Sequence, residues 1–463
     1  MFAVDKMHFE ISERKMLLRL FDVFFVLTAL YLLTYVKAFN YFAVEAGTYH
    51  RAILLAVYLN LFGTIFEMYN LQVASNQFQV LKSTLITAST TVLIYLLTPY
   101  FSPTLPNNRL QIALFFIVVF LSLFAWRMLY VSFLASNRFF QKAVLLCDRV
   151  QVEELIKGLE NIDPHYKIIG FVPLDFESQQ EVYPYVKELD GEAMLSFVKK
   201  HGVSELVIAS QITTGMTTSL YQQLLKALES GIIIREYTQV YESKTQRIPL
   251  QHMSRDFYRF FPFSRSNQNK LYLVTLRGFD VSVAVAGLLV GLALLPLILL
   301  GNALANRGSL FYTQERVGKD GAVFSILKFR TMVKNAEENG AVFTKANDCR
   351  VTAFGKFMRK TRVDEFPQFI NILKGDMAVI GPRPERPVFV KEIAASMPFY
   401  ETRHIIKPGL TGWAQVNYSY GETLQDSLIK LQYDLYYIKH RSIYLDLNIA
   451  FKTITTVLFY RGQ

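Results

Sequence analysis

Four long runs of apolar residues open the chain, and short polar stretches separate them. Each run approaches the roughly 20 residues that cross a bilayer as a helix. Buried core helices are the alternative, but four such runs in succession with short polar loops favour membrane spans. The pattern therefore predicts four transmembrane helices within residues 1–140. The runs cover Leu17–Val36, Ala52–Met68, Leu85–Phe101 and Ile112–Leu134.

After residue 140, short β-rich runs (AVLLC, KIIGFV, ELVIAS and GIIIREY) alternate with helix-like stretches such as VQVEELIKGLE. This alternation predicts a Rossmann-like α/β domain with a mainly parallel sheet over residues 141–245. The stretch that follows the first strand, LLCDRVQVEE, contains no glycine. It therefore lacks the tight turn that lets a backbone approach a pyrophosphate. We expect a structural or regulatory role for this domain rather than nucleotide binding.

Two segments connect this domain to the last third of the chain. Residues 246–270 are basic and aromatic, which fits a linker along the membrane surface or, equally, a solvated loop. Residues 271–306 are apolar enough to span, but a fifth crossing would separate the basic last third from the α/β domain. Pro296 removes a helix hydrogen bond and clashes with the preceding turn. We therefore expect a re-entrant helix that bends at Pro296, with an ordinary kinked span as the alternative.

Composition supports a membrane location. Hydrophobic residues make up 52% of the 463 residues, and the net charge is +11, with much of the excess in the last third. Such a surface suits anionic membrane lipids or phosphorylated substrates. The basic residues form no recognisable nucleic-acid-binding module, so we expect no nucleic acid partner. Cys147 and Cys349 have neither metal-ligand spacing nor a disulfide framework, and no removable signal peptide is evident.

Basic residues also indicate the topology. They lie in the N-terminal tail and after the fourth apolar run, which favours a cytoplasmic N-terminus and a cytoplasmic exit from the fourth span.

The last third, residues 307–463, begins with GSLFYTQERVGKDGAVFSILKFRTM. This stretch predicts two strands around the turn GKDG. Side chains two residues apart share one face of a strand, so Lys328 and Arg330 are expected on the same face. Two cations there would suit a diphosphate, or they form an ordinary exposed edge.

An acid pair, Asp364 and Glu365, lies within RKTRVDEFPQFINILKG. Pro367 favours the first turn of a helix, apolar residues then repeat at helix spacing, and Gly375 is suited to end the helix. The pair is thus predicted at or just before a helix N-terminus. There we expect both carboxylates to be ionised, with pKa values lowered by the helix dipole and nearby arginines.

An ionised Asp364 beside a phosphoryl group is a potential nucleophile, provided that cations cancel the repulsion between the two anions. Glu365 is the expected oxygen ligand of Mg²⁺. The alternative is structural: a helix-capping aspartate beside a salt-bridged glutamate.

Two further motifs follow. GPRPERP places Arg383 and Arg386 in a rigid proline frame that suits a grip on phosphate, or a turn paired with Glu385. In KPGLTGWAQVNY, Trp413 stacks on a base, packs in a core or lies among head groups, and the sequence does not rank these. The apolar tail from Ile443 to Tyr460 lies on the membrane or packs against the catalytic helices.

Three stretches of the last third resemble, in their sequence and order, the bacterial sugar transferase family, the monotopic phosphoglycosyl transferases. They are ERVGKDGAVFSILKFRTM, VTAFGKFMRKTRVDEFPQFINILKGDMAVIGPRPERP and KPGLTGWAQVN. The resemblance covers most of Gly308–Tyr437. The preceding spans and α/β domain look like the long-form members, which initiate exopolysaccharide or O-antigen assembly.

The resemblance implies a reaction at the cytoplasmic face of the bacterial inner membrane. A UDP-sugar, with UDP-glucose and UDP-galactose as the leading donors, transfers sugar-1-phosphate to polyprenyl (undecaprenyl) phosphate and releases UMP. It also implies Mg²⁺ as cofactor and a homodimer through the non-catalytic parts. A non-catalytic membrane-anchored sensor or scaffold with a ligand-binding α/β domain is the alternative function.

The resemblance assigns roles to particular residues. Asp364 is the nucleophile that carries the phospho-sugar, and Glu365 helps to hold Mg²⁺. Many members have Ser before the helix-breaking proline, whereas Leu295 precedes Pro296 here, which leaves the bend angle open. The implied substrate-binding and phosphate-binding residues are Lys328, Arg330, Arg359, Pro382, Arg383 and Pro384.

Overall fold

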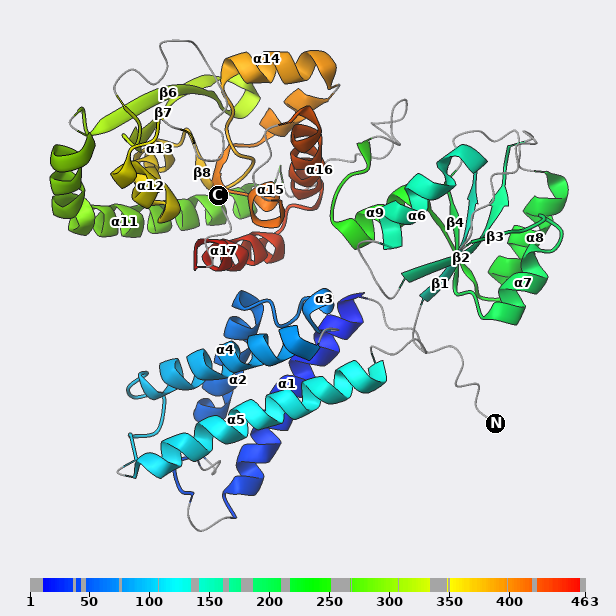
Figure 1. Ribbon diagram of the computed structural model, residues 1–463, viewed down its shortest axis with the longest axis horizontal. Coiled ribbons are helices and arrows are strands. Elements are labelled where there is room, and N and C mark those ends of the chain that lie inside the picture. Colours follow the sequence, from blue (N-terminus) through cyan, green and yellow to red (C-terminus); the bar gives the residue numbers. More distant parts are fainter. Residues whose placement is uncertain are drawn as a thin grey trace. The chain divides into compact units, whose positions relative to one another are not determined.

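The computed structural model divides the chain into two compact units, Met1–Thr245 and Gln246–Gln463 (Figure 1). It describes residues 11–35, 39–42, 47–74, 77–106, 108–134, 141–160, 166–175, 186–209, 217–250, 267, 269–306, 308–333, 348, 350–397, 399–418 and 423–458.

The N-terminal region is helical, and each of its four long helices overlaps one of the four apolar runs. By length and composition, three helices in the described part of the chain suit a membrane crossing: α1, α5 and α11. Two helices are not among them: α2, which has only 17 residues, and α4, whose buried face carries Ser and Thr. The region fits a membrane-anchored protein, and the count of four spans stays a prediction. The helices are α1 Ile11–Leu33, α2 Tyr49–Ile65, α3 Leu71–Ala74, α4 Gln77–Leu96 and α5 Arg109–Leu129, followed by a π turn at Tyr130–Leu134.

A buried ion pair joins the two longest of these helices. Arg127 of α5 donates from Nε to Asp22 Oδ1 of α1 at 3.0 Å, and from Nη1 to the carbonyl of Met68 at 2.7 Å. Both charged side chains are almost inaccessible to solvent. Charges buried in this way are paired because an isolated ion is costly to remove from water.

The predicted parallel α/β sheet is confirmed. Its five strands pair in the order β3-β2-β1-β4-β5, and every pair is parallel. Apolar residues of α6 and α9 pack on one face, and those of α7 and α8 pack on the other. The elements are β1 Gln141–Cys147, α6 Val152–Glu160, β2 Tyr166–Pro173, β3 Lys187–Glu188, α7 Met194–His201, β4 Glu205–Ile208, α8 Thr218–Glu229, β5 Ile233–Glu236 and α9 Tyr237–Thr245.

Ion pairs occupy the carboxyl edge of this sheet. Arg149, just after β1, donates from Nη1 to Asp175 at 2.8 Å and from Nη2 to Glu188 at 2.7 Å. Asp175 also accepts the backbone N–H of Arg149 at 2.8 Å. The acid after β2 is thus engaged by the protein itself. The structural or regulatory role of this domain stays a prediction. Cys147, at the end of β1, is a buried free thiol, and Cys349 lies outside the described residues.

The C-terminal unit is built around α11 and a β-hairpin. The predicted strands around GKDG are confirmed: β6 and β7 pair in antiparallel register, and Asp320 and Gly321 adopt positive φ in the turn. Its elements are α11 Lys270–Gly301, β6 Phe311–Val317, β7 Val323–Phe329, α12 Ala353–Lys360, α13 Gln368–Lys374, β8 Ala378–Ile380, α14 Pro387–Ser396, β9 Gly409–Thr411, α15 Trp413–Asn417, α16 Leu424–His440 and α17 Ile443–Leu458.

The helix α11 contacts this unit along most of its length. Near its start, Arg277 donates to two backbone carbonyls at the end of α13, at 2.6 and 2.7 Å. In its middle, Gly287 lies against the ring of Phe369, and at its end Gly301 lies against Phe354. A Cβ at either glycine would overlap the ring, so glycine permits the close approach. Both ends of this apolar helix therefore meet the same unit.

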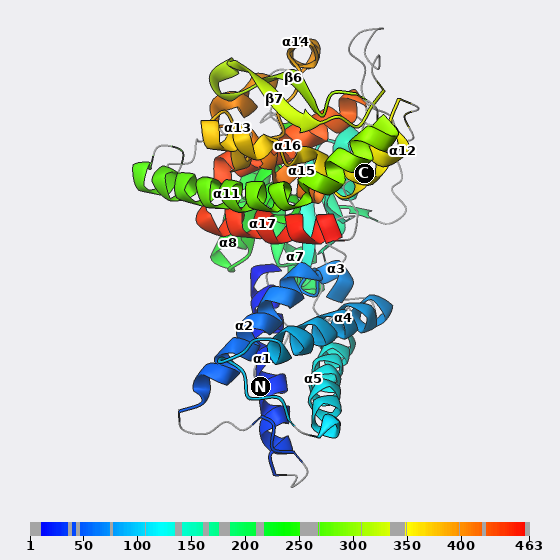
Figure 2. The same ribbon diagram turned by 90° about the vertical axis from the view of Figure 1, so that its left-hand side faces the viewer.

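The helix continues through Pro296 to Gly301, and a π turn at Asn302–Asn306 follows. The ribbon changes direction toward the C-terminal end of this segment in Figures 1 and 2. Proline leaves one carbonyl of the preceding turn without its usual donor, which permits bending. Whether the helix re-enters the membrane stays a prediction.

The start of the predicted linker belongs to the C-terminal unit instead. Ile248 is completely buried in its core and donates its backbone N–H to the carbonyl of Gln432 at 3.1 Å. The Gln246 carbonyl accepts from Trp413 Nε1 at 3.1 Å. Trp413 is only 1% exposed, so it is a core residue among the three places that the sequence left open. Residues 251–266 and 268 of the predicted linker lie outside the described residues.

The C-terminal helix α17 packs partly against the core, and contact of the apolar tail with the membrane stays a prediction. Its Leu445 and Ile449 are buried in the core, while Ile443, Tyr444 and Leu447 are exposed. Figures 1 and 2 show α17 and α11 side by side, and the hydroxyl of Tyr272 joins them through the carboxylate of Asp446 on α17 at 2.5 Å. The end of the predicted tail, including Tyr460, lies outside the described residues.

Candidate active site

The acid pair lies in a tight turn between two short helices. Arg362 follows α12 in the left-handed conformation, with φ of 58°. A 3₁₀ turn at Val363–Glu365 then leads through Pro367 into α13, which ends at Gly375 with φ of 93°. The predicted position at a helix start is thus confirmed. The left-handed residue redirects the chain, so both acids point back into the unit rather than into solvent.

Glu365 is held by three cations through one oxygen. Its Oε1 accepts from Arg383 at 3.2 Å and from Arg362 at 3.3 Å, and Lys328 Nζ lies 3.7 Å away. Burial alone would raise the pKa of Glu365, but Arg383, Lys328 and Arg362 lower it to about 2. The expected ionised state is therefore confirmed for this residue.

Asp364 behaves differently. It is 7% exposed, and no hydrogen bond or ion pair joins its carboxylate to another described residue. Burial, together with the neighbouring charge of Glu365, raises the pKa of Asp364 to about 6, against the smaller lowering effect of the nearby cations. The expectation of a lowered pKa was wrong here. With seven residues, α13 is too short to supply a strong dipole, and the arginines turn to Glu365 instead.

Lys328 comes from β7, and α13 fixes this strand in place. The Asn371 side chain of α13 accepts the backbone N–H of Leu327 at 3.0 Å and donates to the carbonyl of Ser325 at 2.8 Å. This clamp sets the register of the basic strand against the acid pair. Burial is the main cause that lowers the pKa of Lys328, to about 8, so its charge is sensitive to mildly alkaline pH.

Three backbone carbonyls anchor the Pro382–Pro384 segment, which carries Arg383. The carbonyl of Pro382 accepts from the Gly409 N–H at 2.9 Å, and that of Pro384 accepts from Arg316 at 3.0 Å. The carbonyl of Arg383 accepts from Arg403 at 2.9 Å. The guanidinium of Arg383 is thus carried on a backbone fixed at every residue.

A buried ion pair lies behind this segment. Arg403 also donates to Asp434 at 2.7 Å and to the hydroxyl of Tyr400 at 2.7 Å. The two charged side chains are only 6% and 1% exposed. Because breaking such a pair leaves an uncompensated buried charge, it is a strong support for the position of Arg383.

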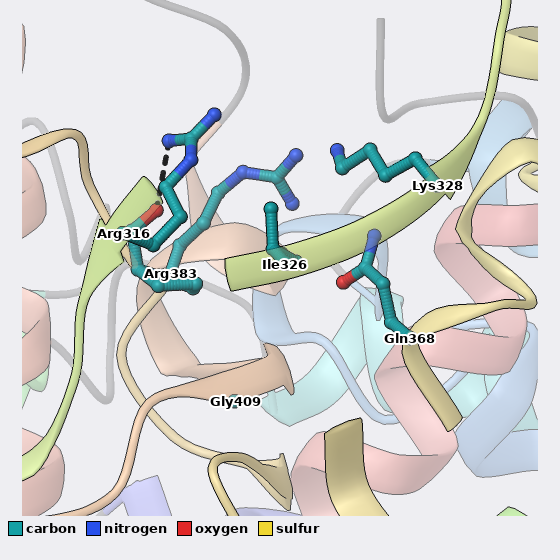
Figure 3. Close-up of a pocket in the computed structure, with 7 residues that line it drawn as sticks. Arg316, Ile326, Lys328, Gln368, Arg383 and Gly409 are labelled. Atoms are coloured by element: carbon teal, nitrogen blue, oxygen red, sulfur yellow. Dashed lines mark hydrogen bonds between the residues drawn. The ribbon is translucent and has the colours of Figure 1, made fainter. Parts of the chain in front are cut away.

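A pocket opens beside the acid pair, and Figure 3 shows three cationic side chains reaching toward it. They come from β6, β7 and the proline segment. Arg316 pairs with Glu385 at 3.5 Å, whereas Lys328 and Arg383 pair with Glu365. Three cations therefore face two glutamates, and this excess of positive charge suits a polyanionic ligand. The lining residues are Arg316, Ile326, Lys328, Gln368, Arg383, Pro384 and Gly409.

Two other predicted cations lie apart from this lining. Arg359 donates from Nε to the hydroxyl of Thr331 at 2.9 Å, and its charge lowers the pKa of Asp364. Arg330 lies beyond the end of β7, where its guanidinium packs near Gly308. No hydrogen bond or ion pair between Arg330 and either acid occurs among the described residues.

Sequence reasoning missed three residues of the site: Arg316, Arg362 and Gln368. Arg316 is at an alternate position of β6 facing the proline segment, so the hairpin pattern contained a signal for it. Arg362 and Gln368 lie within one turn of the acid pair, where helical spacing alone places side chains nearby.

The acids fit Mg²⁺ only with help from a substrate. No group of three or more His, Cys, Asp and Glu residues in the described part of the chain is placed to hold a metal ion. Asp364 and Glu365 supply two carboxylates, and Mg²⁺ commonly combines one or two carboxylates with waters and substrate phosphates. The Oε2 oxygen of Glu365 accepts no hydrogen bond from a described residue, so this oxygen is the one suited to a cation.

Comparisons with known proteins give this site a context. The family described as bacterial sugar transferase matches residues 271–460. The chain is 41% identical over 239 residues to the UDP-N-acetylgalactosamine-undecaprenyl-phosphate N-acetylgalactosaminephosphotransferase of Aeromonas hydrophila, covering 51% of this chain and 54% of that protein. It is 40% identical over 182 residues to the UDP-glucose:undecaprenyl-phosphate glucose-1-phosphate transferase of Escherichia coli, covering 38% and 39%.

A shorter relative is matched over most of its length. The exopolysaccharide production protein ExoY of Sinorhizobium fredii is 35% identical over 208 residues, which cover 41% of this chain and 88% of that protein. The chain spans about half or less of the two longer relatives. The family match at residues 271–460 contains the acid pair. The chain belongs to the bacterial sugar transferase family.

Proposed function

We propose that the protein transfers sugar-1-phosphate from a UDP-sugar to polyprenyl phosphate and releases UMP. Family membership supports the reaction class. The observation that carries the proposal is the state of Asp364: a buried carboxylate without a hydrogen bond, beside a cation cluster that its neighbour Glu365 organises. An enzyme of this kind would catalyse the first membrane step of exopolysaccharide or O-antigen synthesis.

The reaction proceeds in two displacements at one phosphorus atom. A carboxylate oxygen of Asp364 bonds to the sugar-proximal phosphorus, the bond to the bridging oxygen breaks, and UMP leaves. A phosphate oxygen of the polyprenyl phosphate then attacks the same phosphorus, and the bond to Asp364 breaks. The carboxylate is regenerated, and polyprenyl-diphospho-sugar is formed.

The cations make the first displacement feasible. Two anions repel each other, and Lys328 and Arg383 place positive charge at the pocket where the diphosphate binds. Because Asp364 has no hydrogen bond that would have to break, its lone pairs are free for attack. Glu365 keeps the cations oriented.

Mg²⁺ completes the proposed site. Glu365 would hold the ion together with the substrate, and a divalent cation there would neutralise charge that develops on the diphosphate. The support for this assignment is that Glu365 Oε2 accepts no hydrogen bond from a described residue.

We also propose that the catalytic unit lies on the cytoplasmic face of the bacterial inner membrane, held by α11 as a re-entrant helix. The contacts of both ends of α11 with one unit support this topology. A reporter fused after Gln463 should be accessible from the cytoplasm. Access from outside would refute re-entry.

The donor is a UDP-sugar, and we expect UDP-glucose or UDP-galactose. Relatives named for N-acetylgalactosamine and for glucose match this chain at 41% and 40% identity, so UDP-N-acetylgalactosamine belongs in the same panel. The donor that supports the highest kcat/KM identifies the sugar.

The test uses membranes that contain the protein, undecaprenyl phosphate, Mg²⁺ and each UDP-sugar. UMP should appear only when a suitable donor is present. Without the lipid acceptor, intact-mass analysis should find the mass of one phospho-sugar on a peptide containing Asp364. No UMP release with any donor, in membranes where the protein is folded, would overturn the proposal.

A further inference from the structure

Gln368 is a buried amide that the protein leaves without a partner. It is the first residue of α13, it is 3% exposed, and it lines the pocket beside the acid pair. Its Nε2 is buried, and no hydrogen bond from the described part of the chain reaches either end of the amide. Buried polar side chains nearly always have a hydrogen-bond partner, so this one needs an explanation.

A second amide on the same helix shows the contrast. Asn371, three residues later, is equally buried, and its amide both accepts and donates hydrogen bonds to β7. Its structural role is complete. Gln368 contributes nothing of this kind to the fold, although it is fixed on a short, well-packed helix.

The place of Gln368 indicates what it meets. Helical backbone continues from Val363 through α13. Gln368 comes four residues after Asp364 and three after Glu365, so its side chain lies on the same face of the turn as the two acids. Figure 3 shows its amide reaching toward Ile326 and Lys328. Lys328 and Arg383 line the same pocket, which marks it as a phosphate site rather than a base site.

We propose that the side-chain amide of Gln368 donates a hydrogen bond to a non-bridging oxygen of the phosphoryl group that is transferred. The inference rests on the proposed function and adds a substrate-binding residue to it. The Nε2 donor of Gln368 has an acceptor only while the diphosphate, or the phospho-sugar attached to Asp364, is bound.

A neutral donor has an advantage at this position. Each neighbouring cation that contacts the pair is drawn to Glu365, as the contacts of Lys328, Arg362 and Arg383 show. An amide forms no ion pair, so it stays available beside two carboxylates and still supplies an N–H to a phosphate oxygen. It also adds no charge that would hold the product.

The test compares Gln368→Met with Gln432→Met. Methionine keeps the unbranched length of glutamine and removes both hydrogen-bonding ends. We expect Gln368→Met to lower kcat/KM for the UDP-sugar about tenfold, the size of one lost hydrogen bond to a charged group. Gln432 is a matched control, because it is 4% exposed, has an unpartnered buried Oε1, and does not line the pocket. Its variant should keep kcat/KM within twofold.

Stability separates a binding role from a structural one. Removing an unpartnered buried amide should leave the melting temperature of Gln368→Met unchanged or raise it. A lower melting temperature with unchanged kcat/KM would assign Gln368 to the fold and overturn the inference. If Gln368→Met does not fold, the isosteric Gln368→Glu, which replaces the donor by an acceptor, should show a larger loss of kcat/KM.

A binding measurement keeps this inference distinct from the proposed reaction. In an Asp364→Asn background, which does not turn over, UDP and uridine are compared as stabilisers of the protein against heat. Adding Gln368→Met should weaken stabilisation by UDP and leave that by uridine unchanged. An equal effect on both probes, or on neither, refutes the phosphate contact even if the wild type releases no UMP.

Discussion

Acids meet arginines in both units of the chain, with opposite results. In the N-terminal unit, Asp175 takes two hydrogen bonds from Arg149, and both side chains remain nearly one-fifth exposed. In the C-terminal unit, Asp364 is more deeply buried, and no described residue donates to it. Its neighbour Glu365 collects three cations instead.

The difference separates charges that serve the fold from charges that are kept for a ligand. Arg149 is shared between Asp175 and Glu188, so its guanidinium is already engaged by carboxylates of the protein itself. The cluster around Glu365 has more cations than it needs, and the second acid is left ionisable but unpaired. Such an arrangement costs stability, and it is expected where an external anion supplies the missing partner.

The largest effect should follow Asp364→Asn. An amide cannot act as the nucleophile, so UMP release should fall by roughly a thousandfold or more. The melting temperature should stay the same or rise, because the fold no longer has to bury this ionisable group. Initial rates of UMP release and a thermal unfolding curve check both parts. Turnover within a few-fold of wild type would assign Asp364 to the same structural class as Asp175.

Much of this contrast could be predicted from the sequence. The hairpin around GKDG and the helix from Pro367 to Gly375 follow from local turn chemistry and spacing, and the structure confirms both. The parallel sheet likewise follows from short β-rich runs between amphipathic helices.

The charge state of the acids could not be predicted in the same way. Asp364 and Glu365 are adjacent and share the same local sequence, but the direction of each pKa shift depends on which carboxylate the cations contact. Arg383 reaches Glu365 from 18 residues away, across a tertiary contact. The partners of Arg403 and the unpartnered amide of Gln368 are tertiary features too.

The pH dependence of donor turnover sharpens the comparison next. With its pKa raised to about 6, Asp364 should lose its nucleophilic form below that pH, and kcat/KM should fall tenfold per pH unit. Above about 8, Lys328 loses its charge and kcat/KM should fall again. Lys328→Arg keeps the charge at all pH values, so its profile should lose only the alkaline limb. A flat wild-type profile from pH 5 to 9 would contradict both assignments.

The same pKa shift predicts how stability depends on pH. The folded state raises the pKa of Asp364 above its usual value, so the fold favours the protonated acid. This stabilisation is present below pH 4 and is lost as the pH rises through about 6. Asp364→Asn should not lose it, so the variant should gain stability relative to wild type between pH 4 and pH 7 in urea unfolding. A constant difference across this range would argue against the raised pKa.

A smaller loss of activity should follow Asp434→Asn. The change leaves the buried charge of Arg403 uncompensated, which should lower the free energy of unfolding by about 3 kcal/mol. Because Arg403 also fixes the carbonyl of Arg383, we expect UMP release to fall about tenfold, mainly through a raised KM for the donor. Urea unfolding and donor kinetics measure the two effects. Lost stability with unchanged KM would show that the proline segment needs no such support.

The smallest effect should come from Asp175→Asn, the same substitution that is decisive at Asp364. Its ion pair with Arg149 is partly solvated, so its loss should cost about 1 kcal/mol of unfolding free energy. Glu188 still pairs with Arg149 and limits the damage. UMP release should stay within twofold of wild type, because Asp175 is already hydrogen-bonded within the protein and is not expected to bind the substrate. A changed KM for the UDP-sugar in Asp175→Asn, with the fold intact, would contradict the division into a structural acid and a catalytic acid. The carboxyl edge of the parallel sheet would then be part of the substrate-binding site.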